Sequence, residues 1–157
     1  MSIGGLLKGH DLFGALSVED VDRISRISSV KDFEAGEAIF ANNGRGTHIY
    51  LLLEGRVHLR IPTDPEEVSI VASRVEKGEI FGLSPMLGSP RYTSSAHCQV
   101  RSSVLAIEAK PLRDLLQSNC TAGFQIMNRV AHVYFERYIN VLKNLQAIVN
   151  QIPLIHL

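Results

Sequence analysis

The sequence predicts a mainly β protein, an antiparallel β-roll or jelly roll (a double-stranded β-helix) with helices at both ends. From residue 30 to about residue 108, apolar residues recur in short alternating runs separated by turn residues, as in a series of short strands. On both sides of this region the apolar spacing is helical. A length of 157 residues suits one domain, 1–157, with N-terminal helices in 6–29, a β-roll in 30–109 and C-terminal helices in 110–152.

The first helical region is predicted at 6–29. Ser17 is a residue type that caps helix N-termini, and Glu19 and Asp20 follow in the first turn, where the helix dipole favours acidic side chains. One face is apolar at helical spacing and consists of Val18, Val21, Ile24 and Ile27. We therefore expect a helix that packs by that face alone.

The central region contains seven candidate strands, namely 38–40, 47–53, 56–61, 68–75, 79–81, 92–97 and 100–107. Residues with turn chemistry separate several of them, at 42–46, 54–55, 62–65 and 77–78. Short strands at such regular spacing indicate an antiparallel roll or jelly-roll barrel.

After Lys110 the spacing becomes helical again. Pro111 suits the first turn of a helix that runs to about Ser118, and Thr121 is a candidate cap for a longer helix that Pro153 ends. On the long helix, apolar residues alternately four and three apart form a predicted coiled-coil seam, Met127, Ala131, Tyr134, Tyr138, Val141, Leu145, Ile148 and Ile152. A second apolar stripe, expected to lie on the roll, consists of Phe124, Phe135, Leu142 and Val149.

Two apolar faces on one helix predict two partners, which are the roll of the same chain and a second copy of the chain. The sequence therefore predicts a parallel, two-fold symmetric homodimer through the long helix. The alternative is a helix that lies wholly on its own domain in a monomeric protein.

The segment 78–93 has the composition of an anion-binding loop. Gly78, Gly82 and Gly88 permit positive φ and the close approach of another group. A short helix at 83–87 would direct the free N–H groups of its first turn toward an anion, and Arg91 would add a charged, two-pronged contact. We therefore predict a phosphate site in this segment.

The same segment resembles a known motif. Gly-Glu-x-Phe-Gly at 78–82 and Gly-Ser-Pro-Arg-x-Thr at 88–93 are similar to the phosphate-binding cassette of cyclic nucleotide-binding domains, which occur in catabolite-activator-type regulators, kinase regulatory subunits and gated channels. Further similarity lies at 10–13 (His-Asp-Leu-Phe), 33–37 (Phe-Glu-Ala-Gly-Glu) and 50–57 (Tyr-Leu-Leu-Leu-Glu-Gly-Arg-Val). The resemblance covers roughly residues 6–150.

This resemblance implies a non-catalytic ligand-sensing module, similar to the sensor domain of such a regulator without its DNA-binding part. The implied ligand is a cyclic nucleotide (cyclic AMP or cyclic GMP) or a related phosphorylated small molecule. Ligand contacts to the cassette and the long helix would favour one packing of that helix over another. In the family, the long helix often also forms the dimer, which agrees with the predicted seam.

The resemblance also implies roles for individual residues. Phosphate and ribose contacts fall on Gly82, Leu83, Ser84, Arg91, Tyr92 and Thr93. A helix-start cap remains the alternative for Ser84, and a core or rim position the alternative for Tyr92. The family's base contacts come from the long helix, where Asn128 and His132 are the candidates, whereas Phe124 suits core or dimer packing better.

Leu83 departs from the family's pattern, in which a glutamate after Phe-Gly accepts a hydrogen bond from the ribose 2′-hydroxyl. The segment before Arg91 is also about one residue shorter than the family's. A buried hydroxyl without a partner costs on the order of 1–3 kcal/mol. We therefore expect a weakened or altered ligand preference, and the second hypothesis is a dimerisation or interaction module that has lost nucleotide binding.

Composition and motifs argue against other classes. Basic and acidic residues are balanced at 16 each, whereas nucleic-acid binders normally carry a basic excess, so this chain alone is not expected to bind nucleic acid. There is no Gly-x-Ser-x-Gly motif, and Cys98 and Cys120 lie in no catalytic pattern, so we assign no catalytic residue and no enzymatic activity. The histidines form no His-x-His, and we assign no metal site or cofactor; a cupin-like metalloenzyme and a haem-sensing variant remain the distant alternatives.

The N-terminal residues lack the long apolar core of a signal peptide, and no stretch approaches 18 continuous apolar residues. The two cysteines do not require an oxidising compartment. We therefore predict a soluble, cytoplasmic protein without a membrane partner.

Overall fold

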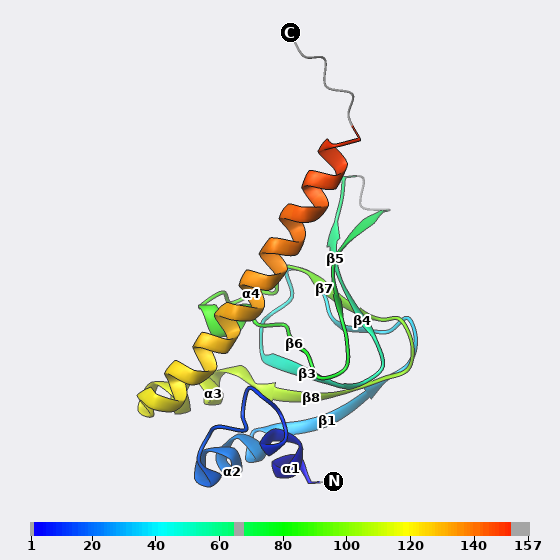
Figure 1. Ribbon diagram of the computed structural model, residues 1–157. Helices are drawn as coiled ribbons and strands as arrows, with labels where there is room; N and C mark the ends of the chain where they lie inside the picture. The colour runs from blue at the N-terminus through cyan, green and yellow to red at the C-terminus, as the bar shows by residue number, and fades with distance from the viewer. Residues whose placement is uncertain (1, 65–67, 152–157) are drawn as a thin grey trace.

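The computed structural model describes residues 2–64 and 68–151. In chain order these residues form α1 (Ile3–Lys8), α2 (Val18–Arg26), β1 (Ser28–Phe33), β2 (Ala38–Phe40), β3 (His48–Glu54), β4 (Val57–Pro62), β5 (Ser69–Val75), β6 (Ile80–Phe81), the 3₁₀ helix η1 (Ser84–Leu87), β7 (Ser95–Cys98), β8 (Ser102–Glu108), α3 (Ala109–Ser118) and α4 (Cys120–Val149). Figure 1 shows the strands as a roll with α1 and α2 on one side and α4 along another. The predicted antiparallel β-roll with helices at both ends is confirmed.

The strands form two four-stranded sheets, with the orders β1-β8-β3-β6 and β2-β7-β4-β5. All pairs are antiparallel, and the central pairs β3–β8 and β4–β7 join distant parts of the chain. The consecutive strands β3 and β4 lie in different sheets, so the chain crosses between the layers at Gly55, whose φ is +99°. Crossings of this kind, which also occur between β1 and β2, β5 and β6, and β7 and β8, fold the chain into a roll rather than a single flat sheet.

Alternation along β3 builds two cores. Ile49 and Leu51 point to the helices, whereas Tyr50 and Leu52 point between the sheets, because successive strand side chains lie on opposite faces. The first core therefore joins the sheet to all four α-helices, and the second fills the interior of the roll. The cassette lies where the two cores meet, since Phe81 belongs to the second core and Leu83 to the first.

The helix α4 contacts the roll through Ile126 and Val130, which are fully buried. The predicted second stripe does not lie on the roll, because Phe124 and Phe135 are 74% and 60% exposed. That prediction was wrong for a simple reason. Most of the circumference of α4 is apolar, so its sequence alone could not decide which stripe faces the sheet.

Several predicted bounds also change. The first region contains two helices, begins at Ile3 and ends in β1, a strand that the sequence did not reveal because its residues Ser-Ser-Val-Lys-Asp-Phe are mostly polar and exposed. Asn119, not Thr121, caps α4, and its side-chain oxygen accepts a hydrogen bond from the N–H of Ala122 at 3.2 Å. The seam residue Ile152 and the helix end at Pro153 lie outside the described residues.

Candidate ligand-binding site

The glycines shape the cassette as the sequence predicts. The backbone of Gly82 has φ +65°, and a Cβ at this position would lie 2.9 Å from Cδ2 of Tyr50 and 3.0 Å from Cε1 of Phe40. Gly88 has φ +82° and ends the helix η1, to which it donates a hydrogen bond at Ser84 O. A side chain at residue 82 would therefore be both strained and crowded, so glycine is needed there.

A cavity of about 250 Å³ lies between the cassette, the interior of the roll and α4. Three parts of the chain line it. The roll contributes Phe40, Leu59, Ile61, Ala72 and Ser73, the cassette and the segment after it contribute Gly82, Leu83, Ser84, Tyr92, Thr93 and Ser94, and α4 contributes Tyr134, Arg137, Tyr138 and Val141. The cavity thus connects the cassette to the long helix.

Five of the six predicted phosphate and ribose residues line this cavity, and Arg91 is the exception. The Arg91 side chain is exposed, and its Nη1 donates a hydrogen bond to Asn43 O at 2.7 Å. The neighbouring backbone is also bound to the turn at 42–46, since the N–H of Tyr92 donates to Gly44 O at 2.9 Å. The structure therefore directs Arg91 to a turn of the roll rather than into the cavity.

The backbone N–H groups of Gly82, Leu83 and Ser84 remain candidate donors to an anion, as the sequence suggested. Within the described ranges, these three N–H groups donate no backbone hydrogen bond. Close to them, Oγ of Ser84 and Oγ1 of Thr93 lie 3.5 Å apart. This side of the cavity therefore offers amide and hydroxyl donors to an anion.

Leu83 and Tyr92 are core residues as well as lining residues. Leu83 is 1% exposed and packs in the core beneath the helices. Tyr92 stacks on Phe40 with ring centroids 4.0 Å apart, and its hydroxyl donates to His48 O at 2.7 Å. The Tyr92 hydroxyl is thus committed to β3, and the apolar side chain of Leu83 gives the cassette wall no acceptor.

The predicted base-contact residues lie elsewhere on α4. Asn128 and His132 are exposed, do not line the cavity, and occupy a different face of the helix from Tyr134 and Arg137. His132 instead lies beside Glu136, with Nε2 3.2 Å from Oε1. Arg137 was missed by the sequence reasoning, although a charged residue within the buried face that contains Val130 and Val133 was a usable signal.

Arg137 is the cation of this cavity. Burial lowers the pKa of its guanidinium, while Glu79 and Tyr134 act in the opposite direction. Its Nη2 donates a 2.6 Å hydrogen bond to Ile80 O, and among the described residues it forms no salt bridge. Burial likewise raises the pKa of the Tyr134 hydroxyl, so this group stays neutral beside it.

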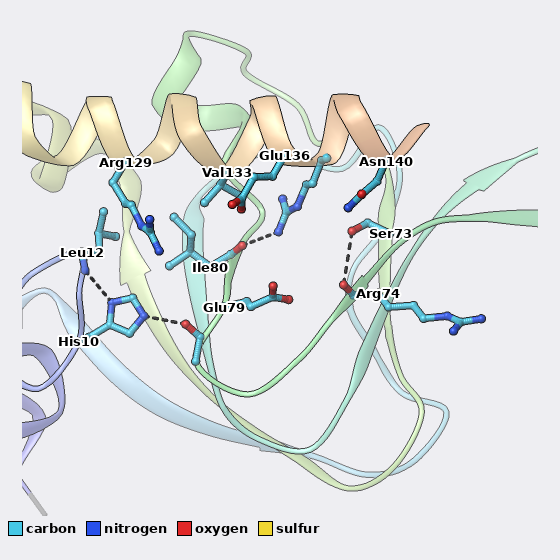
Figure 2. A pocket seen from close by; sticks show the side chains of 12 residues that line it. His10, Leu12, Ser73, Arg74, Glu79, Ile80, Arg129, Val133, Glu136 and Asn140 are labelled. Carbon is cyan, nitrogen blue, oxygen red and sulfur yellow. Dashed lines mark hydrogen bonds between the residues drawn. The ribbon is translucent and has the colours of Figure 1, made fainter. Parts of the chain in front are cut away.

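A second, smaller cavity of about 130 Å³ lies on the other side of Arg137. Figure 2 shows its walls, with His10 and Leu12 from the N-terminal segment, Ile80 from β6, and Arg129 and Glu136 from α4. Nε2 of His10 lies 2.7 Å from Gly78 O. The base of the cassette is therefore held from two directions, by the N-terminal segment and by α4.

Other chemistry is not evident in the part of the chain that the structure describes. No three His, Cys, Asp or Glu side chains gather there as a metal site would require. Cys98 is buried, and burial raises the pKa of its thiol, whereas Cys120 is exposed. None of the described helices combines the length and the apolar character that crossing a membrane requires.

Comparison with known proteins agrees with this geometry. Residues 30–119 match the model of the cyclic nucleotide-binding domain family. No curated protein matches the chain. A solved structure from Geobacter metallireducens, provisionally described as a cyclic nucleotide-binding protein, is 31% identical, has a TM-score of 0.76, and is matched over 88% of this chain and 99% of its own.

Two further solved structures share the fold at lower identity. The sensor domain of the transcriptional regulator DNR from Pseudomonas aeruginosa is 19% identical, with a TM-score of 0.72 over 98% of this chain and 95% of its own. The catabolite activator protein from Thermus thermophilus is 21% identical, with a TM-score of 0.68 over 83% of this chain and 61% of its own. The chain belongs to the cyclic nucleotide-binding domain family, and its fold is that of a ligand-sensing regulatory module.

Proposed function

We propose that the chain senses a cyclic nucleotide or a related phosphorylated small molecule, bound without catalysis in the 250 Å³ cavity. The observation that most supports this proposal is that the cassette and α4 line the same cavity. The unbonded amides at 82–84 and the hydroxyls of Ser84 and Thr93 suit a phosphate, since helix starts and hydroxyl donors stabilise anions. Arg91 would take part only after leaving Asn43 O.

The sensing mechanism would be a shift between two packings of α4. Tyr134, Arg137, Tyr138 and Val141 all belong to this helix and line the cavity, so a ligand touches α4 directly. A ligand that contacts one helix position better than another moves the equilibrium by that difference in affinity. No output element is needed for this first step, which links ligand binding to the geometry of α4.

A homodimer through α4 is part of the proposal. On α4, the side chains of Phe135, Tyr138, Leu142 and Leu145 are exposed and form a large apolar face on the long helix that Figure 1 shows alongside the strands. Exposed apolar faces of this kind are typical of association surfaces. Pairing of two copies along α4 would cover this face and bring two cavities close to one dimer axis.

Isothermal titration calorimetry with cyclic AMP, cyclic GMP and cyclic di-GMP tests the ligand proposal. We expect saturable binding of a mononucleotide, and stabilisation by about 2.7 kcal/mol at a ligand concentration of one hundred times Kd. Thr93→Val should weaken binding, whereas Ser69→Ala, at the far end of β5, should not. The absence of binding by all three nucleotides would instead favour an interaction module, which the outward direction of Arg91 also supports.

A further inference from the structure

We propose that the cavity selects a compact organic anion with an aromatic or aliphatic body and few hydroxyl groups, and that Arg137 is the counter-charge of this anion. The inference rests on the proposed function, because it narrows the ligand class of the same cavity. It also assigns to α4 the charge recognition that the sequence assigned to Arg91.

The charge of the cavity comes from α4. Arg137 is the charged side chain among the described lining residues, which include no aspartate or glutamate. Glu79 favours the charged form of the desolvated guanidinium but forms no salt bridge with it, so an anion that joined the guanidinium would offset the desolvation cost that remains. Since the bond to Ile80 O uses one of the five N–H donors, the guanidinium retains donors for a ligand.

The remaining wall suits an apolar body. Phe40, Leu59, Ile61, Leu83 and Val141 present aliphatic or aromatic surface to the cavity. Burial of a ligand's apolar surface against these side chains favours binding. The volume of about 250 Å³ lies below that of most sites for drug-sized molecules, so the ligand must be compact.

Ligand hydroxyl groups find no carboxylate acceptor among the described lining residues, whose neutral polar side chains also include the hydroxyls of Ser73, Ser94, Tyr134 and Tyr138. The hydroxyl of Tyr92 donates to His48 O, and Leu83 presents only carbon atoms at the cassette wall. Ser84 and Thr93 lie within 3.5 Å of each other and would be drawn to the anion. A sugar hydroxyl that leaves water for this cavity would therefore gain at most a bond to a neutral hydroxyl group, and not the stronger bond to a carboxylate.

Calorimetric titration of the full chain with matched probes tests the selectivity. We expect 1-naphthyl phosphate to bind at least tenfold more tightly than neutral 1-naphthol and than hydroxyl-rich ribose 5-phosphate. We also expect 2′-deoxy cyclic AMP to bind at least as tightly as cyclic AMP. The first pair measures the need for negative charge, and the second isolates one hydroxyl group.

Substitutions of Arg137 then test its role as the counter-charge of the anion. Arg137→Gln removes the charge and retains an N–H donor for Ile80 O, so 1-naphthyl phosphate should lose about ten- to hundredfold in affinity. Arg129→Gln, on the same helix but outside the lining of this cavity, should leave the affinity unchanged. If Arg137→Gln fails to fold, Arg137→Lys tests the role of the charge and should retain charge-dependent binding. The probe pairs, measured on the unsubstituted chain, then test the selectivity of the cavity.

The outcomes separate this inference from the proposed function. Cyclic AMP that binds at least tenfold more tightly than its 2′-deoxy form, with an affinity insensitive to Arg137→Gln, overturns the inference and leaves the sensing function standing. Failure of every anionic probe to bind the unsubstituted chain overturns both.

Discussion

Arg137 and Ile80 join the long helix to the base of the cassette through a 2.6 Å hydrogen bond from the guanidinium to the carbonyl oxygen. Two residues earlier, Gly78 O accepts a 2.7 Å hydrogen bond from His10. The other ring nitrogen of His10 accepts from the N–H of Leu12 at 3.1 Å, so Nε2 carries the proton that reaches Gly78 (Figure 2). The segment 78–80, which leads into β6, is therefore contacted both by α4 and by the N-terminal segment.

Loss of the Arg137 side chain should destabilise the fold. We expect Arg137→Ala to lower the free energy of unfolding by about 1.5–3 kcal/mol, because a hydrogen bond from a charged donor is lost and Ile80 O is left buried. Urea denaturation measures the change. Arg129→Ala is the matched control, since the exposed Arg129–Asp11 pair at 4.0 Å should contribute less than about 1 kcal/mol. Equal effects of the two substitutions would contradict the proposed link.

Leu83 should behave as a core residue. We expect Leu83→Ala to cost about 2–5 kcal/mol of stability, since truncation of a fully buried leucine leaves a cavity. Leu87, at the end of the 3₁₀ helix that follows Leu83, is 53% exposed, so Leu87→Ala should change stability by less than about 0.5 kcal/mol. Chemical denaturation of both variants gives the comparison. A small effect at residue 83 would show that the cassette wall is looser than the packing indicates.

The two glycines of the cassette base should differ in their tolerance of alanine. Gly78 and Gly82 both have positive φ, but a Cβ at Gly78 has no atom within 4 Å, whereas at Gly82 it would meet Tyr50 and Phe40. We expect Gly78→Ala to cost about 1–2 kcal/mol through backbone strain alone. Gly82→Ala should cost clearly more, because the aromatic rings must also move. Thermal unfolding of the two variants under the same conditions tests this order.

Stability should fall in mild acid. Burial, helped by Arg74 and Arg60 for His58 and by Arg60 for His97, lowers the pKa of these histidines below the usual 6.5, and His48 shifts in the same direction. The unfolded state therefore binds protons first, so stability declines as the pH falls through about 6.5 toward the lower folded values. We expect His58→Gln to flatten this decline in unfolding curves measured from pH 7.5 to 5. High salt should reduce the part that comes from the arginines.

The exposed face of α4 should hold two chains together. Leu142 and Leu145 lie on this face, so Leu142→Lys combined with Leu145→Lys should place charge in the contact and give the mass of one chain. Light scattering coupled to size-exclusion chromatography measures the mass. Asn140→Lys, an exposed polar site on the opposite side of the same helix, should leave the dimer intact. A single-chain mass for the unsubstituted protein would refute the proposed pairing.

Local pattern in the sequence was enough to determine the class of fold and the position of the cassette. Strand and helix spacing predicted the roll and its flanking helices, and Gly82 and Gly88 adopt the positive φ that their place in the segment suggested. Both are short-range properties, because alternation sets which face of a strand is buried and a missing Cβ sets which backbone angles are allowed. The strand β1 was not predicted, because a mostly exposed polar strand has no alternation of apolar and polar residues.

Only the tertiary structure decided which charged groups face the cavity. Arg91 follows the cassette directly, yet the turn at Asn43, far away in sequence, accepts its hydrogen bond and draws its side chain outward. Arg137 reaches the cavity because α4 packs on the roll through Ile126 and Val130, a choice that is left open by a helix with apolar residues over most of its circumference. Long side chains take their direction from contacts with distant residues, and these contacts exist only once the chain has folded.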